Sequence, residues 1–154
     1  AYRVLDSQYF GVPQRRRRVF VCGFRGDWRN ATKVLFDSGS LSKLVKTGCS
    51  RRLEITRTLK GTTTGGRGDD APLVLTQDGI RFATPIEWER LQGFSANYTL
   101  VPFENYSLMD CPERLRYKAI GNSMSVPVIA WLGERIQAVH NEMIFRFSES
   151  LYYV

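Results

Sequence analysis

The stretch Tyr117–Pro127, with the sequence YKAIGNSMSVP, decides how the rest of this chain is organised. Within it, Ile120–Ser123 predicts a tight loop, because a glycine is followed by two small polar residues that can bond to their own backbone or to a ligand. Pro127 suits the first turn of a following helix, with Ser125 near its cap. A loop just before a helix can hold a polar small molecule against backbone N–H groups, and an ordinary capped helix explains the same pattern.

The residues after Pro127 predict a long helix. The chain then ends in the aromatic segment 145–154, which we expect to pack on the domain or to pair as an edge strand. Apolar side chains of the predicted helix recur at steps of four, four, three and four, which places them on one face: Val128, Leu132, Ile136, Val139 and Met143.

The composition indicates a folded protein of 154 residues, large enough for one domain with a core or for a small domain and part of another. No apolar run approaches the length of a membrane span and no signal peptide opens the chain, so we expect a cytoplasmic protein. Three widely spaced cysteines and a single histidine argue against a disulfide framework and against a metal site: Cys22, Cys49, Cys111 and His140.

Positive charge is concentrated in the first half of the chain. Residues 1–80 carry a formal net charge of +8 and residues 81–154 one of −1, which together give the +7 of the whole sequence. A basic half suggests a polyanionic partner, most simply nucleic acid, because lysine and arginine neutralise backbone phosphates. A solvated basic surface explains the charge equally well, so charge alone leaves both interpretations open.

Four arginines lead into a strand-like segment. The residues Val19–Phe24 are β-branched and aromatic, which predicts a buried strand with Cys22 in the core. If extended geometry reaches back through Arg15–Arg18, alternate arginines point to opposite faces, Arg16 and Arg18 to one of them. Such a run is poorly explained as a solvated face. We therefore expect at least one pair at the edge of a site, where a guanidinium donates to an oxygen-rich ligand.

Residues 25–80 have a different character, because they are rich in Gly, Ser, Thr, Lys and Arg, and residues 62–70 predict a loop. Short strands are plausible at Leu53–Leu59 and Leu73–Leu75. Basic side chains interleaved with hydroxyls suit phosphate contacts, although a flexible linker has the same composition. The candidate DNA-binding residues are Arg51, Arg52, Arg57, Lys60 and Arg67.

Residues 84–93 predict a short helix with both ends specified. Thr84 and Glu87 form a capping box around Pro85, which suits the first helical position. The helix should run over Pro85–Gln92 and end at Gly93, a natural position for a left-handed residue. Residues 95–116, with two turn prolines, predict a surface loop.

Three separated stretches now match one family in order, and the chain resembles the C-terminal part of DNA cytosine-5 methyltransferases. Residues Tyr9–Phe20, with the core Gln-x-Arg-x-Arg, look like the family's motif VIII. Residues Arg81–Phe94 look like motif IX, and Arg116–Val128 look like motif X. A variable basic segment separates the first two, and the resemblance covers nearly the whole chain.

The resemblance implies a mixed α/β fold: part of an S-adenosylmethionine-dependent methyltransferase sheet domain with a small loop-rich target-recognition lobe. Residues 1–24 would end the catalytic domain, 25–115 would form the recognition lobe with the motif IX helix, and 116–154 would return to the catalytic domain. Motif VIII arginines line the target-cytosine pocket in the family, and motif X closes the pocket of the cofactor S-adenosyl-L-methionine. The implied catalytic residues are Arg16 and Arg18, and the implied cofactor-binding residues are Gly121, Asn122 and Ser123.

The resemblance also implies what these residues do not contain. The family's nucleophile is the cysteine of a Pro-Cys-Gln motif, and none of the three cysteines has that context. Carbon 5 of cytosine reacts only after a thiolate adds to carbon 6 of a flipped-out base. We therefore expect a fragment that is inactive alone and whose partners are double-stranded DNA and the N-terminal catalytic half.

Two alternatives remain open: a natural DNA-specificity subunit of a split methyltransferase, and a relative that methylates cytosine in RNA. The resemblance points to a bacterial or phage-type, nucleoid-associated enzyme of the kind found in restriction–modification systems. A sheet cut from its partner half exposes an edge and apolar surface, so we also expect the fragment to self-associate.

Overall fold

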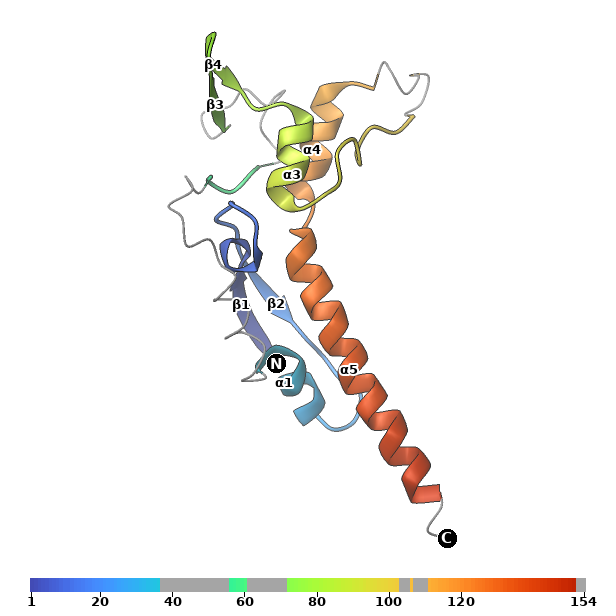
Figure 1. The fold of residues 1–154 in the computed structure, drawn as a ribbon. Helices are drawn as coiled ribbons and strands as arrows, with labels where there is room; N and C mark the ends of the chain where they lie inside the picture. The colour runs from blue at the N-terminus through green and yellow to red at the C-terminus, as the bar shows by residue number, and fades with distance from the viewer. Residues whose placement is uncertain (37–55, 61–71, 103–105, 107–110, 152–154) are drawn as a thin grey trace.

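The computed structural model describes residues 1–36, 56–60, 72–102, 106 and 111–151, the last six without their side chains. It is a mixed α/β structure with two small antiparallel sheets, which confirms the expected class. The elements fall into two groups along an elongated molecule (Figure 1). A lower lobe contains β1, β2, α1 and α5, and an upper lobe contains β3, β4, α3 and α4. No helix in the described ranges could span a bilayer.

The lower lobe starts with a two-stranded antiparallel sheet of β1 (Tyr2–Asp6) and β2 (Arg17–Val21). The 3-10 turn η1 (Ser7–Phe10) joins them and ends at Gly11, whose φ of 87° is a left-handed conformation that favours glycine. Asp6 anchors this connection, because its carboxylate accepts hydrogen bonds from the backbone N–H groups of Gln8 and Arg16.

The expectation that residues Val19–Phe24 form a buried strand with Cys22 in the core is wrong for this chain. β2 exists, but Val19 is 62% exposed and Val21 79%, and Cys22 is half-buried. Across the sheet, Val19 pairs with Val4 and Val21 pairs with Tyr2, and both partners are also exposed. We call these four apolar side chains the outer sheet face. The residue types are those of a buried strand, but nothing in the described part of the chain covers this face.

Helix α1 (Arg29–Phe36) follows β2 in a segment that we expected to be loop-rich. The carboxylate of Asp27 accepts a hydrogen bond from the backbone N–H of Arg29 at 3.0 Å, near the start of the helix. Its apolar side chains Ala31, Val34 and Leu35 are buried, at the spacing of one helical face. The helix packs against α5, so it belongs to the lower lobe.

Helix α5 (Val126–Leu151) confirms the predicted long helix and extends through residues that we expected as a packed tail or edge strand. Val128 and Trp131 pack with Leu5 and Phe10 in the lower core, and the rings of Phe10 and Trp131 meet edge to face at 5.6 Å. The predicted face was wrong at Ile136, which is 53% exposed. The buried face includes Trp131 instead. An α-helix has 3.6 residues per turn, so residues spaced four apart move gradually around the helix and off the buried face.

The upper lobe is organised around α3 (Pro85–Gln92), whose predicted bounds and ends are confirmed. The capping box between Thr84 and Glu87 is complete, and Gly93 ends the helix with a φ of 85°. Its Trp88 is fully buried and meets Tyr117 edge to face at 4.8 Å. The hairpin of β3 (Leu73–Thr76) and β4 (Gly79–Phe82) precedes it and confirms the predicted strand at Leu73–Leu75.

Helix α4 (Glu113–Asn122) corrects two expectations. Its start lies inside the predicted loop 95–116, and its last turn contains Ile120–Asn122, which we expected as a tight loop. The turn between helices begins only at Ser123, because Ile120 is fully buried in the upper core and continues the helical face of Tyr117. The predicted strand Leu53–Leu59 is present only as a backbone bridge between Thr56 and Gln14, and residues 53–55 lie outside the described ranges.

Candidate functional site

Arg16 lies where the two lobes meet and bonds to both of them. Arg16 is 6% exposed, and its guanidinium donates to three backbone carbonyls: Leu59 at 3.0 Å, Gly121 at 3.1 Å and Ser123 at 2.7 Å. Burial, and then the neighbouring charge of Arg18, lower the pKa of Arg16 to about 10. Both terminal nitrogens of this predicted catalytic arginine are therefore used in hydrogen bonds within the chain. These bonds join the segment before β2 to the α4–α5 turn.

The same turn is held from the other side by α3. Gln92 is fully buried and donates through Nε2 to the carbonyl of Ile120 at 2.6 Å, and Ser123 donates to the same carbonyl through Oγ at 2.6 Å. The backbone N–H of Ser123 closes α4 by donating to Ala119 at 3.0 Å. The motif IX helix and the motif VIII strand thus fix the position of the motif X turn together.

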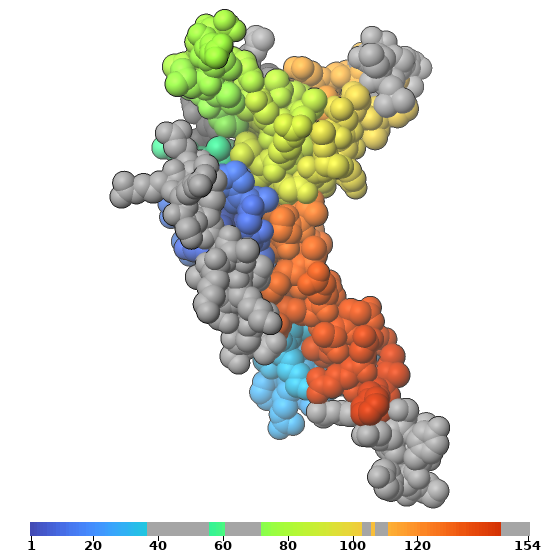
Figure 2. Space-filling view, in the orientation of Figure 1, coloured from blue at the N-terminus to red at the C-terminus, as the bar shows by residue number. Residues whose placement is uncertain are grey.

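A close approach of α3 and α5 completes the junction. A Cβ atom added at Gly93 would lie 2.7 Å from Cδ of Pro127 and 3.5 Å from a methyl group of Val12. Only glycine allows this contact, since its φ of 85° is already unfavourable for other residues. In Figure 2 the blue surface of the N-terminal residues lies beside orange α5 and beneath yellow-green α3.

The three predicted cofactor residues differ in what they can offer a ligand. Gly121 is buried and its carbonyl is occupied by Arg16, while Ser123 is half-buried and bonded within the turn. Asn122 is exposed, and its side chain has no hydrogen-bond partner among the described residues. Ser125, which is 5% exposed, has an Oγ atom with no partner in the same part of the chain.

Other buried polar atoms at the junction are also left over. Both atoms of the Gln14 side-chain amide and the Nε of Arg16 are buried without a hydrogen-bond partner among the described residues. Buried polar atoms in folded proteins are nearly always hydrogen-bonded. These three atoms are therefore polar groups beside the motif VIII segment that the described residues leave unsatisfied.

Arg18 has a different environment from Arg16, although the sequence places the two on the same strand face. Arg18 is exposed, and its Nη1 donates to the carbonyl of Arg17 at 2.7 Å. It pairs across the sheet with Leu5, whose side chain packs in the core below α5. Of the two predicted catalytic arginines, only Arg18 presents its guanidinium to solvent.

Two of the predicted DNA-binding residues are described. Arg57 and Lys60 are exposed on the segment 56–60, which is bonded to Pro13 and Arg15 through the backbone of Thr56. Arg51, Arg52 and Arg67 lie outside the described residues. No group of side chains able to hold a metal ion occurs in the described part of the chain.

A buried ion pair that we did not predict lies on the upper-lobe side of the junction. Glu89 is fully buried in α3 and accepts hydrogen bonds from Arg116 at 3.1 Å and from the backbone N–H groups of Asn97 and Thr99. Burial acts to raise the pKa of Glu89, but the hydrogen bonds from Thr99, Arg116 and Asn97 outweigh it and lower the pKa. The sequence signal was weak, because Glu89 lies between Trp88 and Arg90, two residues after the capping Glu87, and nothing local marks it as buried.

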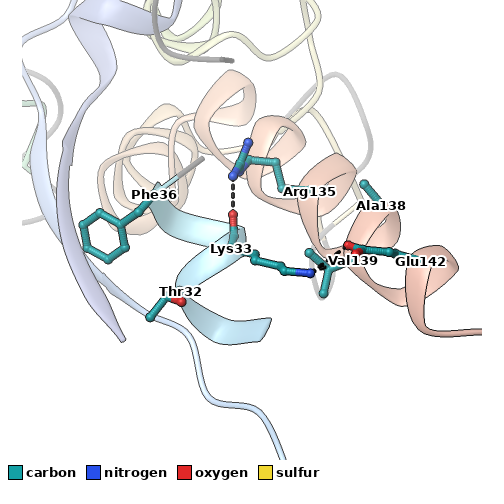
Figure 3. Close-up of a pocket in the computed structure, with 7 residues that line it drawn as sticks. All are labelled: Thr32, Lys33, Phe36, Arg135, Ala138, Val139 and Glu142. Atoms are coloured by element: carbon teal, nitrogen blue, oxygen red, sulfur yellow. Dashed lines mark hydrogen bonds and ion pairs between the residues drawn. The ribbon is translucent and has the colours of Figure 1, made fainter. Parts of the chain in front are cut away.

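A separate hollow of about 640 Å³ lies between α1 and α5. Figure 3 shows two of the contacts of its charged groups: Lys33 bonds Glu142 at 2.9 Å, and Arg135 donates to the backbone carbonyl of Lys33. Arg135 also donates to the carbonyl of Val34. These bonds hold α1 against α5. The hollow is therefore a helix–helix contact, and its described lining residues offer a ligand no unused charge.

Comparison with known proteins shows the family to which the chain belongs. The sequence profile of the C-5 cytosine-specific DNA methylase family matches residues 1–47 and 37–138 in two overlapping segments. The chain belongs to this family. It therefore shares ancestry with enzymes that use S-adenosylmethionine and act on DNA.

The relatives are bacterial and phage methyltransferases. The type II methyltransferase M.HpaII of Haemophilus parainfluenzae is 32% identical over 86% of this chain and 49% of its own length. The type II methyltransferase M2.BsuMI of Bacillus subtilis is 27% identical over 88% of this chain and 39% of its length. A DNA N-6-adenine-methyltransferase of Escherichia phage P1 is 38% identical over 37% of this chain, but over only 10% of its own length. The chain spans about half or less of each.

Proposed function

We propose that this chain is the C-terminal part of a DNA cytosine-5 methyltransferase and supplies DNA recognition and one side of the base and cofactor pockets. The observation that carries the proposal is the junction at Arg16. There the motif VIII strand entrance binds the motif X turn, 105 residues further along the chain, by direct hydrogen bonds. A methyltransferase needs these two segments together, because the base and the methyl donor must meet at one point.

In this proposal the two arginines of the motif VIII segment have different roles. Arg18, the exposed arginine of the pair, donates to the oxygen of a flipped cytosine. Arg16 is a positioning residue that holds the motif X turn. The nucleophilic cysteine comes from the catalytic half outside these 154 residues, so the chain alone transfers no methyl group.

S-Adenosylmethionine supplies the methyl group when it is bound, and the α4–α5 turn fits one wall of its site. The fit rests on the exposed amide of Asn122 and the orphan hydroxyl of Ser125, which offer hydrogen bonds that the chain does not use. Gly121 and Ser123 shape the turn, because their backbone carbonyls accept hydrogen bonds from Arg16.

The division into lobes follows from the same proposal. Residues 1–24 and 116–154 belong to the catalytic domain, and 25–115 contain the recognition lobe, although α1 packs with the catalytic part. The missing catalytic half covers the outer sheet face and gives the orphan atoms of Gln14 their partners.

The test starts from the native protein that carries this sequence, captured from source cells with an antibody raised against the 154-residue chain. We expect a mass well above 17.7 kDa and transfer of methyl groups from labelled S-adenosylmethionine to carbon 5 of cytosine in duplex DNA. The isolated chain should give no transfer. Methylation at adenine N6, preference for RNA, or turnover by the isolated chain would overturn the proposal. A native mass near 17.7 kDa with a co-purifying partner would instead establish the split-subunit arrangement.

A further inference from the structure

Gln92 is a buried side chain of α3 whose contacts reach the α4–α5 turn. It is fully buried in the last turn of α3, a helix that belongs to the upper lobe. Its amide Nε2 donates to the carbonyl of Ile120 at 2.6 Å, and its Oε1 lies 3.3 Å from Oγ of Ser123, within hydrogen-bond distance. These two contacts lie on either side of Gly121 and Asn122 in the sequence. One side chain of the upper lobe therefore brackets the turn that contains the candidate cofactor residues.

The carbonyls of this turn need partners from outside α4, because the last carbonyls of a helix have none within it. Ile120 is fully buried, and its carbonyl accepts hydrogen bonds from Gln92 and from Ser123. From the lower lobe, Arg16 bonds two further carbonyls of the turn. The side chain of Asn122, by contrast, is exposed. The bonded carbonyls therefore fix the backbone from which Asn122 projects.

The backbone that carries Gln92 has little freedom of its own. The next residue, Gly93, ends α3 in a left-handed conformation, and its N–H donates to the carbonyl of Arg90 at 3.0 Å. A Cβ atom added at Gly93 would lie 2.7 Å from Cδ of Pro127, so the end of α3 lies directly against the first turn of α5. The amide of Gln92 is thus presented to the α4–α5 turn from a fixed position.

Other contacts between α3 and α4 hold the two helices together without touching the turn. Glu89 bonds Arg116 at 3.1 Å, and the ring of Trp88 meets that of Tyr117 edge to face. Both partners lie at least three residues before Ile120 on α4. Gln92 lies one turn further along α3 than Glu89 and bonds the turn itself. Removing its amide should therefore leave the helix pair in place and release the turn.

We propose that Gln92 is a positioning residue of the cofactor site, through which the recognition lobe holds the α4–α5 turn in the arrangement that binds S-adenosylmethionine. The inference rests on the proposed function and deepens it. Gln92 is buried and touches no ligand, so it acts through Ile120 and Ser123. A site that adopts its binding arrangement only part of the time loses affinity in proportion to that fraction. The turn thus has two supports, Arg16 on the catalytic side and Gln92 on the recognition side.

The experiment measures the binding of S-adenosyl-L-methionine by titration calorimetry, without DNA, to the full-length protein that carries this chain. Gln92→Met has a similar length and makes no hydrogen bond to the turn. Gln92→Glu keeps the shape but places an acceptor against the carbonyl of Ile120. The control variant is Leu91→Ala, at the neighbouring position, whose side chain packs on the upper core. Melting temperature and affinity for duplex DNA are measured on the same samples.

We expect both Gln92 variants to bind S-adenosyl-L-methionine about five- to tenfold more weakly, which is the effect of one lost hydrogen bond. Their affinity for duplex DNA should equal that of wild type, and in a methyl-transfer assay KM should rise for the cofactor and not for DNA. Leu91→Ala should melt lower and bind the cofactor as wild type does. An equal loss of cofactor affinity in Leu91→Ala, an equal loss of DNA affinity, or wild-type cofactor affinity in either Gln92 variant would overturn the inference.

Two further outcomes separate the sources of failure. If the wild-type protein does not bind S-adenosyl-L-methionine, the proposed function fails and the inference fails with it. If wild type binds the cofactor and the Gln92 variants bind it equally well, the inference alone fails. Gln92→Glu decides the result if Gln92→Met does not fold. If neither variant folds, Gln92 serves the stability of the upper lobe and the positioning role is wrong.

Discussion

At the scale of single residues, two arginines of one motif differ in burial. Arg16 and Arg18 stand on the same strand face, yet Arg16 is buried with three carbonyl partners and Arg18 is exposed. A sequence pattern assigns both to one face but cannot distinguish them. The difference depends on the carbonyls of Leu59, Gly121 and Ser123, which come from distant parts of the chain.

Replacing these two arginines should therefore affect different properties of the full-length protein. Arg16→Ala leaves three buried carbonyls without a donor, at about 1–3 kcal/mol each when nothing relaxes, so we expect a clear fall in melting temperature. Arg18→Ala should change stability by less than about 0.5 kcal/mol but lower the rate of methyl transfer much more than the affinity for DNA. Calorimetry and a methyl-transfer assay on the same samples measure the two effects. Intact turnover in Arg18→Ala would contradict its assignment to the base pocket.

Gly93 offers a second test at this scale. Gly93→Ala combines a left-handed backbone with a Cβ atom 2.7 Å from Pro127, so we expect a loss of about 2–4 kcal/mol in the free energy of unfolding. Gly133→Ala is the matched control, because it lies within α5 with nothing near an added Cβ, and it should gain about 0.5–1 kcal/mol. Chemical denaturation measures both. A neutral Gly93→Ala would mean that α3 and α5 do not approach in solution.

At the scale of elements, helices with local stop and start signals were predictable, and those that depend on packing were not. α3 carries its capping box, proline and terminal glycine within ten residues, and the structure reproduces all three. α4 begins without a side-chain cap, after Pro112, and its length follows from the burial of Tyr117 and Ile120. α1 has a weak local signal and docks through bonds that Arg135 donates from α5.

The capping box of α3 predicts how stability depends on pH. The ion pair with Arg81, together with hydrogen bonds from Thr84, lowers the pKa of Glu87 from 4.5 to about 2. A carboxyl with a depressed folded-state pKa stabilises the fold above its unfolded pKa, and that stability is lost as the pH falls from about 4.5 towards about 2. Glu87→Gln should therefore melt lower at pH 7 and lose less stability than wild type across that range.

Glu134→Gln is the control for this measurement, because Glu134 is exposed on α5 and far from the cap. Thermal unfolding followed by circular dichroism at a series of pH values compares the three proteins. If Glu87→Gln and wild type show the same pH dependence between 4.5 and 2, the ion pair with Arg81 contributes nothing to α3.

At the scale of the whole molecule, the structure is two cores joined by polar contacts. The upper core gathers around Trp88 and the lower one around Trp131, and the junction between them is made by Arg16, Gln92 and the approach of Gly93 to Pro127. The chain spans about half or less of the length of the curated relatives that it matches.

The outer sheet face predicts association of the isolated chain. Val19 and Val21 are exposed beside Tyr2 and Val4, and exposed apolar strands pair with one another in concentrated solution. We expect Val19→Lys/Val21→Lys to shift the sedimentation profile towards monomer without lowering the melting temperature. The control is Ile129→Lys/Ile136→Lys, which adds the same charge at exposed positions of α5. A strictly monomeric wild-type chain, or an equal effect of the two variants, would contradict the prediction.

The sequence by itself determined the family, the mixed α/β class, the ends of α3 and the presence of a long helix after Pro127. These features depend on residues close together, whose hydrogen bonds and steric limits are local. Only the tertiary structure decided that α4 runs through Asn122, that Arg16 points inward, and that Arg15, Arg17 and Arg57 line one hollow. Each of these depends on partners 40 or more residues away, and the geometry of such contacts is set by packing rather than by local preference.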